Sequence, residues 1–95
     1  MNSSKAVQID PRDNVAVALS DVKVGNKVNV VTETEVIEII AKSDITFGHK
    51  IALVAFQPQK PIIKYGEEIG KSKDIIAVGE WVHLHNVYCE RGRED

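Results

Sequence analysis

The sequence predicts a small all-β domain, folded as a compact barrel or β-clip from short strands. Short runs rich in valine and isoleucine recur along the chain, and turn signals with glycine or proline separate them about every ten residues. The chain has 95 residues, enough for one domain with a single modest core. Strand patterns do not alternate with long helical patterns, so a parallel α/β fold is not expected, and no internal repeat is apparent.

Three strands are expected in the first half of the chain. In Val15–Leu19 larger side chains alternate with small ones, which is the two-residue period of a strand. Val28–Val31 is a β-branched run that follows the turn signal Gly25-Asn26. Glu33–Ile40 fits either an amphipathic helix or a strand, and its valine and isoleucine content favours the strand.

Further strand candidates follow in the second half. Lys50–Phe56 fits either a strand or a short helical turn, which Pro58 would end. Pro61–Tyr65 is expected to be a short strand closed by a glycine. Trp81–Val87 alternates apolar and polar residues, so we expect a half-buried strand with Trp81 or a neighbour facing the core.

The two ends of the chain differ in composition from the part between them. Residues 1–13 mix serine, asparagine, lysine, glutamine and aspartate with one proline, and are expected to form a flexible lead-in. Residues 14–88 hold the strand candidates and are expected to form the folded domain. Residues 89–95 are expected to be a charged C-terminal tail.

Charge and composition narrow the classes of partner. The formal net charge is -2 and the pI is about 5.9, so no basic excess points to nucleic acid or to an anionic membrane. The apolar runs are far shorter than the ~20 residues of a membrane span, and the N-terminus lacks the apolar core of a secretory signal. The single cysteine, Cys89, fits a reducing compartment, so we expect a cytoplasmic protein with an unreactive thiol.

The histidines His49, His83 and His85 are the first candidates for chemistry. Residues two apart on a strand point to the same face, so His83 and His85 would project together with Cα atoms ~6–7 Å apart. Such a pair suits shared metal ligation or contact with an anion. On the residues alone, a solvated strand face is the commoner explanation of such a pair.

Two other places combine polar groups with a glycine. Lys64 and Tyr65 set a cation and a phenol beside Gly66, where a backbone can approach a ligand closely; a plain strand end is the alternative. Asp44 and His49 would share one loop, and an Asx-type turn is the alternative there. The sequence contains no GxGxxG, P-loop, GxSxG, HExxH or CxxC motif. We therefore expect a module that presents its polar groups to another molecule.

Three segments taken together resemble the N-terminal domain of the altronate/galactarate dehydratase family. Asp44–Leu53, DITFGHKIAL, is similar to the family form D-I-P-x-G-H-K-x-A-L. Ile62–Gly70, IIKYGEEIG, is similar to V-I-K-Y-G-x-x-I-G, and Gly79–Val87, GEWVHLHNV, is similar to G-x-x-V-H-x-H-N. The sequence departs from the family at Thr46, where proline is usual, and at Trp81, where histidine is common.

The resemblance covers roughly residues 14–87 and implies an SAF domain over residues 14–88, an all-β β-clip with short strands and one short helical turn. In this family the SAF domain is fused to a large catalytic domain or encoded as a separate small subunit. Because the sequence starts at Met1 and ends soon after the third motif, we expect the small subunit. Its partner would be the large catalytic dehydratase subunit, and exposed edge strands would also permit a homo-oligomer.

The resemblance further implies a hydro-lyase that eliminates water from a sugar acid such as altronate. A base would remove the proton next to the carboxylate, the 3-hydroxyl would leave, and a divalent metal, Fe2+ in the family, would serve the assembled enzyme. The alternatives are the small subunit of a sulfolactate sulfo-lyase and a non-catalytic SAF module that binds a carbohydrate or a partner. The expected roles are catalytic for His49, His83 and His85, metal-binding for His83 and His85, and substrate-binding for Lys64, Tyr65 and Asn86.

Overall fold

The computed structural model describes residues 3–88, and this part of the chain contains nine short strands and one 3-10 turn. The all-β prediction is confirmed: no α-helix occurs in that part, and none of it forms a helix long and apolar enough to span a bilayer. In chain order the elements are β1 (Ser3–Val7), β2 (Val15–Ala18), β3 (Lys27–Val31), β4 (Val36–Ile40), β5 (Lys50–Ala52), β6 (Pro61–Lys64), β7 (Glu67–Ser72), β8 (Trp81–Val82), η1 (Leu84–Asn86) and β9 (Val87–Tyr88).

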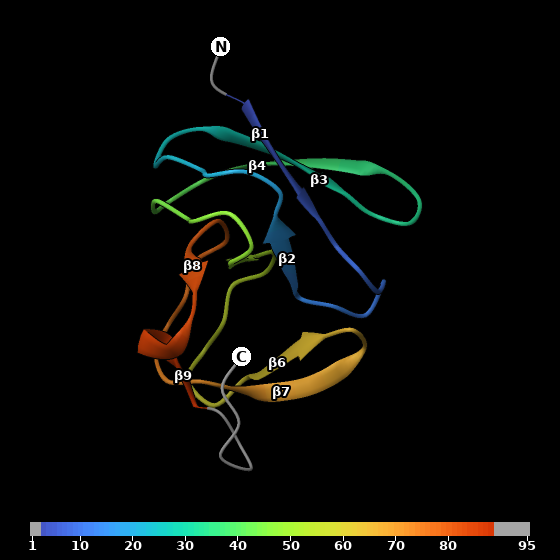
Figure 1. The fold of residues 1–95 in the computed structure, drawn as a ribbon. Helices are drawn as coiled ribbons and strands as arrows, with labels where there is room; N and C mark the ends of the chain where they lie inside the picture. Colours follow the sequence, from blue (N-terminus) through green and yellow to red (C-terminus); the bar gives the residue numbers. More distant parts are fainter. Residues whose placement is uncertain (1–2, 89–95) are drawn as a thin grey trace.

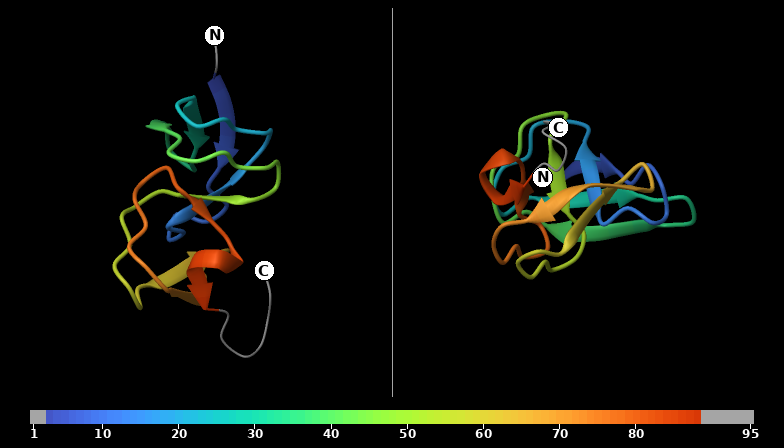
Figure 2. Two further views of the ribbon diagram at one scale, coloured as in Figure 1. Left: turned by 90° about the vertical axis from the view of Figure 1, so that its left-hand side faces the viewer. Right: turned by 90° about the horizontal axis from the view of Figure 1, so that it is seen from below.

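The strands form two sheets. One has six strands in the order β4-β3-β1-β2-β5-β8, and the other has three in the order β6-β7-β9. All neighbours are antiparallel except β1 and β3, which run parallel. The three-stranded sheet lies at one end of an elongated body of 40 × 26 × 20 Å, opposite the β1–β3–β4 end (Figures 1 and 2).

The expected lead-in is instead part of the fold. Within residues 3–13, β1 lies between β2 and β3 in the six-stranded sheet, and Ala6 is fully buried. Asp13 is also buried, and its carboxylate accepts a hydrogen bond from the Gly66 backbone N–H at 2.8 Å. The sequence pattern missed β1 because its partners are distant in the chain and its exposed positions are serine and lysine. The expected tail, residues 89–95, lies outside the described residues.

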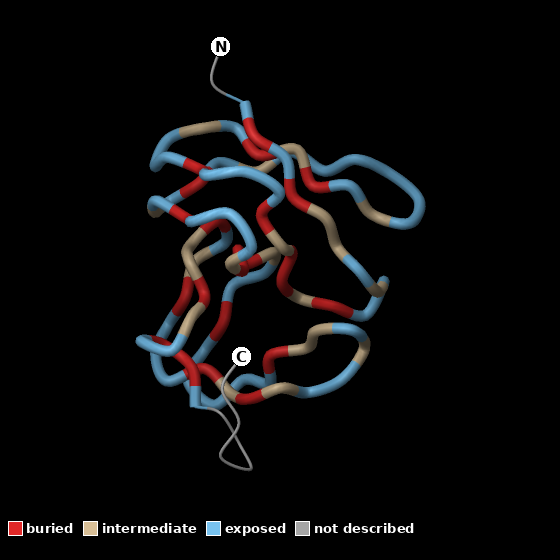
Figure 3. Tube along the Cα trace, viewed as in Figure 1, coloured by how far each residue is buried: buried red, intermediate tan, exposed pale blue. Residues whose placement is uncertain are grey.

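The predicted strands of the first half are confirmed with small shifts of their ends, and Glu33–Ile40 forms the edge strand β4 and no helix. Lys50–Phe56 forms a strand only over its first three residues. In Figure 3 the edge strand β4 and the loop that joins it to β3 are largely exposed, whereas β3 itself contributes the buried Val28 and Val30 to the core.

Four turns of one geometry recur along the chain. In each, the first residue accepts a backbone hydrogen bond from the fourth, and the third has a positive φ of 74–93°, as in a type II turn. The third residue of each turn donates its N–H to the carbonyl of one small buried residue, and the carbonyl of the fourth residue accepts from the N–H of that same residue. The four turns are Lys23–Asn26, Thr46–His49, Gln57–Lys60 and Ala77–Glu80, and their buried partners are Ala41, Ala18, Ser72 and Ala52.

The turns join in pairs, which gives the fold its two halves. The first pair meets at the Val22–Ile45 bridge, and there Asp21 accepts a hydrogen bond from the Phe47 N–H at 2.8 Å. Asp44 reciprocates by accepting from the Val24 N–H, also at 2.8 Å. The second pair of turns meets at the Phe56–Ile76 bridge.

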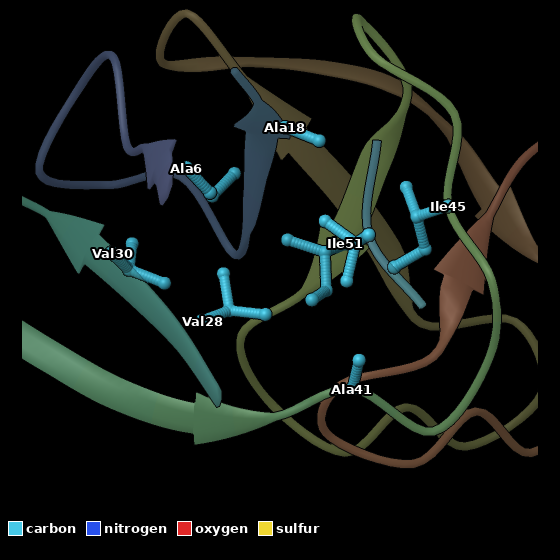
Figure 4. Packing of buried hydrophobic residues seen from close by; sticks show 9 residues of the cluster. Ala6, Ala18, Val28, Val30, Ala41, Ile45 and Ile51 are labelled. Carbon is cyan, nitrogen blue, oxygen red and sulfur yellow. The ribbon is translucent and has the colours of Figure 1, made fainter. Parts of the chain in front are cut away.

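Each half has its own core. The first half packs small side chains, mostly alanine and valine, around Ile45 and Ile51 (Figure 4). The second half packs larger ones around Phe56, with Ile62 and Ile76 fully buried beside it. Asn14 joins the two sheets because its side chain bonds to the backbone of Pro61 and Ile63 in β6 at 3.0 and 2.8 Å.

Candidate functional site

Four aromatic rings gather where the second turn meets β8. His49 is the fourth residue of the turn Thr46–His49, and Trp81 opens β8. His83 and His85 lie within or beside the 3-10 turn η1 that follows β8, on the left-hand side of Figure 1. The structure therefore brings the three predicted histidines together, with Trp81 among them.

The rings stack closely. The centroids of His49 and His83 are 4.5 Å apart with an interplanar angle of 20°, and those of Trp81 and His83 are 5.3 Å apart at 13°. His49 and Trp81 stack at 5.8 Å, and His85 meets Trp81 at 4.6 Å with a tilt of 35°. Trp81 thus contacts all three imidazoles, at distances typical of favourable aromatic pairs. We call His49, Trp81, His83 and His85 the imidazole cluster.

Backbone hydrogen bonds fix the elements that carry the cluster. The His49 N–H donates to Thr46, and its carbonyl accepts from the buried Ala18. The Trp81 N–H donates to the Ser43 hydroxyl at 3.2 Å, and Trp81 pairs with Ile51 in the sheet. The rings are therefore held on rigid backbone, a requirement for a precise site.

The expected strand over Trp81–Val87 is wrong. β8 ends at Val82, and Leu84–Asn86 form the 3-10 turn η1 before β9 begins. Asn86 is the physical reason: its side-chain oxygen accepts from the His83 N–H and its amide donates to the Trp81 carbonyl, both at 2.9 Å. These bonds replace ladder bonds and curl the chain, so His83 and His85 converge on Trp81 from a turn.

One hydrogen bond within the cluster defines the state of His49. The Trp81 indole Nε1–H donates to His49 Nδ1 at 3.1 Å. An indole nitrogen can only donate, so Nδ1 is the acceptor in this contact, and a neutral His49 that accepts there carries its proton on Nε2. His49 and His83 are half-buried and His85 is exposed, so the cluster borders on solvent.

Asn86 was predicted to bind substrate, and the structure places it under the cluster. Its side chain is almost fully buried, and both ends of its amide are bonded to the backbone of η1 and β8. In this arrangement Asn86 shapes the turn that presents His83 and His85.

Lys64 and Tyr65 are not brought to the cluster. They lie at the tip of the β6–β7 hairpin, on the side of the molecule opposite η1 in Figure 1. Tyr65 and Gly66 both have positive φ, 56° and 74°, which makes a two-residue type I′ turn. The Lys64 ammonium lies 5.2 Å from the centroid of the exposed Tyr65 ring, so the pair forms a cation–π contact at the tip.

The loop that precedes β2 braces this hairpin. Asp10 accepts two hydrogen bonds from the Arg12 guanidinium at 3.0 Å, and this side-chain contact holds the pKa of Asp10 below its ordinary value and raises that of Arg12. Gly66 packs against Arg12, where an added Cβ would lie 2.5 Å from a guanidinium nitrogen. Gly66 is therefore explained by turn geometry and close packing.

The described residues do not fit the divalent metal on their own. Across residues 3–88, no three His, Cys, Asp or Glu side chains are grouped so as to hold a metal ion. His49 Nδ1 is already bonded to Trp81, and one carboxylate oxygen of Asp44 is bonded to the Val24 backbone. Asp44 therefore braces a turn, the kind of role that the sequence offered as the alternative to a loop site shared with His49.

Trp81 is the member of the cluster that the sequence analysis did not assign to the site. The sequence predicts a strand with Trp81 or a neighbour facing the core, and position 81 departs from the family pattern. Its position two residues before His83 was the available signal, but its bond to His49 joins residues 32 apart in the chain.

Comparison with known proteins identifies the family and the relatives that the chain resembles. The family model described as the altronate/galactarate dehydratase SAF domain matches residues 4–90. The altronate dehydratases of Bacillus subtilis (strain 168) and Escherichia coli (strain K12) are 38% and 40% identical over 80 residues, which are 84% of this chain and 15% of each enzyme. The (2R)-sulfolactate sulfo-lyase subunit alpha of Paracoccus pantotrophus is 40% identical over 62 residues, 65% of this chain and 92% of that subunit.

Proposed function

The chain belongs to the altronate/galactarate dehydratase SAF-domain family, and on that premise we propose that it is the SAF component of a hydro-lyase that eliminates water from a sugar acid. The imidazole cluster would complete a site whose other parts belong to a large catalytic chain. The matched region spans 15% of the length of each altronate dehydratase, and the proposal assigns the remaining machinery to that large catalytic chain.

The observation that carries the proposal is the convergence of the three predicted histidines. His49 comes from the first family motif, and His83 and His85 come from the third. His49 is far from the other two in the chain, yet the rings meet around Trp81 at centroid distances of 4.5 to 5.8 Å. Half-buried and exposed imidazoles on a rigid support suit contact with a carboxylate or hydroxyl of a bound substrate.

Elimination next to a carboxylate defines what such groups do. A base takes the proton α to the carboxylate, negative charge develops on the carboxylate oxygens, and the 3-hydroxyl departs with a proton. A hydrogen-bond donor held at the developing charge lowers the barrier. His49, whose proton is on Nε2, suits that donor role, and the exposed His85 suits contact with the departing hydroxyl. The divalent metal of the family, expected as Fe2+, would be bound mainly by the large chain and would act as a Lewis acid there.

The test is reconstitution with a large dehydratase-like chain, sought first in the neighbouring reading frame. Co-purified complex should release 2-keto-3-deoxy acid from altronate or galactarate. His49→Ala, His83→Ala and His85→Ala should each lower that activity without dissociating the complex, whereas Lys73→Ala, a change in an exposed cation outside the cluster, should not. Full activity in all three histidine variants would remove the site from the proposal and favour a non-catalytic binding module.

A sulfo-lyase is the second candidate, and one observation favours it. The aligned region covers 92% of the subunit alpha of a two-subunit sulfolactate sulfo-lyase, so this chain matches nearly all of that protein. A substrate panel that includes sulfolactate separates the two reactions, because sulfite release from sulfolactate marks the sulfo-lyase and keto-acid formation from an aldonate marks the dehydratase.

A further inference from the structure

Trp81 is the residue whose role neither the family pattern nor the proposed reaction accounts for. It stands where the resembling family commonly has histidine, and it is the one member of the imidazole cluster that cannot titrate. Its ring contacts all three imidazoles, and its indole N–H is bonded to one of them, at His49 Nδ1.

The bond selects one of two forms of neutral imidazole. If the His49 proton were on Nδ1, that N–H and the indole N–H would face each other at 3.1 Å, with two donors and no acceptor. With the proton on Nε2, Nδ1 accepts the indole N–H and the remaining N–H is available to another acceptor. The indole therefore disfavours one tautomer and stabilises the other.

Both partners of this hydrogen bond, Trp81 and His49, are held in place by other contacts. Trp81 is fixed through its N–H by Ser43 and through its carbonyl by Asn86, and His49 is fixed by the type II turn. His83 stacks on the rings of both Trp81 and His49, at interplanar angles of 13° and 20°. The stacked ring of His49 cannot easily flip to present its other nitrogen to the indole, so the N–H of the selected tautomer points in a fixed direction.

We propose that Trp81 is a positioning residue that holds His49 in its Nε2-protonated tautomer, so that His49 acts on the sugar acid as a hydrogen-bond donor. This inference rests on the proposed function for its substrate, but the tautomer itself is a property of this chain alone. A neutral imidazole that donates from a fixed nitrogen stabilises a developing oxyanion without transferring its own proton. A histidine at position 81 could not fix the tautomer in this way, because its ring nitrogens can either donate or accept.

The first test reads the tautomer directly. Long-range proton–nitrogen NMR of the full chain with labelled histidine, at about pH 8 and so above the ordinary histidine pKa, distinguishes protonated from unprotonated ring nitrogens. His49 should show a protonated Nε2 and an unprotonated Nδ1. In Trp81→Phe, which keeps an aromatic ring but loses the N–H, the two nitrogen signals should move towards a tautomeric average.

A matched control separates the indole N–H from the general support of β8. Ser43→Ala removes the bond to the Trp81 backbone and leaves the indole untouched, so the His49 pattern should stay as in the parent chain. An Nδ1-protonated His49 in the parent chain overturns the inference even if Trp81→Phe fails to fold. An unchanged His49 pattern in folded Trp81→Phe overturns it as well.

Kinetics of the reconstituted complex provide the second test. Loss of the orienting bond should lower kcat about tenfold in Trp81→Phe and leave KM within about twofold, because the donor acts on charge that develops in the transition state. Equal kcat in an active Trp81→Phe complex overturns the inference while the proposed function stands. A tautomer change in Trp81→Phe with no lyase activity in any complex supports the positioning role and overturns the proposed function.

Discussion

The imidazole cluster and the tip of the β6–β7 hairpin both derive from segments that resemble the family pattern, yet they differ in physical character. In the cluster, side chains from two distant segments meet ring to ring, and the backbone beneath them is held by other residues. At the tip, the notable residues are neighbours, and their positive φ angles form a type I′ turn. A motif match therefore marks a cluster of converging side chains in one place and backbone geometry in the other.

The difference in burial supports this reading. The tip exposes Tyr65 to 60% and has its cation, Lys64, over that ring. The cluster instead half-buries His49, Trp81 and His83, which limits water around them and strengthens polar contacts. Substitutions test this contrast, and the largest effects are expected in the backbone that supports the cluster.

Gly79→Ala should have the largest effect. Gly79 has a φ of +93°, and an added Cβ would lie 2.2 Å from the Ile40 carbonyl oxygen. The left-handed backbone and the clash together should lower the free energy of unfolding by about 3 kcal/mol or more. Denaturant titration measures this loss. Gly25→Ala is the control: its φ is +91° but its Cβ would meet nothing within 4 Å, so only about 1–2 kcal/mol should be lost. Equal losses would show that the approach of Ile40 is not important.

His49→Gln should have the next largest effect, on activity and not on folding. Glutamine retains a polar side chain but loses the imidazole that bonds Trp81 and stacks on His83. If His49 donates to the developing oxyanion, kcat of the reconstituted enzyme should fall about 100-fold. The thermal midpoint should change little because the His49 side chain is only half-buried. A kcat within threefold of the parent enzyme would contradict a catalytic role.

Asn86→Ala should affect both stability and activity, because it removes the amide that shapes η1. The His83 N–H and the Trp81 carbonyl would each lose a bond of 2.9 Å in a nearly buried place. We expect a loss of about 2 kcal/mol in unfolding free energy, measured by denaturant titration. Activity should fall with it, since His83 and His85 would no longer converge. Asn86→Asp keeps one acceptor for His83 and should recover part of the stability.

The strands that the sequence predicted are those whose pattern is local. β2, β3 and β4 show alternation or β-branched runs within their own residues, and these suffice for their identification. β1 could not be found in this way, because its place depends on a parallel pairing with β3. The repeat of four turns was hidden because one of them uses Pro58-Gln59 where the others have glycine in third place.

The sequence predicted three of the four residues of the imidazole cluster, but it did not predict how they are arranged. The three histidines were named from the motifs, but the reason given, a shared strand face for His83 and His85, is wrong because the strand ends at Val82. Alternating residues imitated a strand where Asn86 redirects the backbone into a 3-10 turn. No local pattern could reveal the bond between Trp81 and His49, since it depends on the register of β8 with β5.

Tyr65→Asn should have the smallest effect and the opposite sign. Tyr65 has a φ of 56°, which is costly for a tyrosine, and Asn-Gly is the preferred sequence of a type I′ turn. We expect unfolding free energy to rise by about 0.5–1 kcal/mol, offset in part by loss of the cation–π contact with Lys64. Activity of the reconstituted enzyme should be unchanged, because the hairpin tip lies away from the imidazole cluster. A rise in KM of tenfold or more would return Tyr65 to the substrate site, and would mean that the large chain folds the two regions into one active centre.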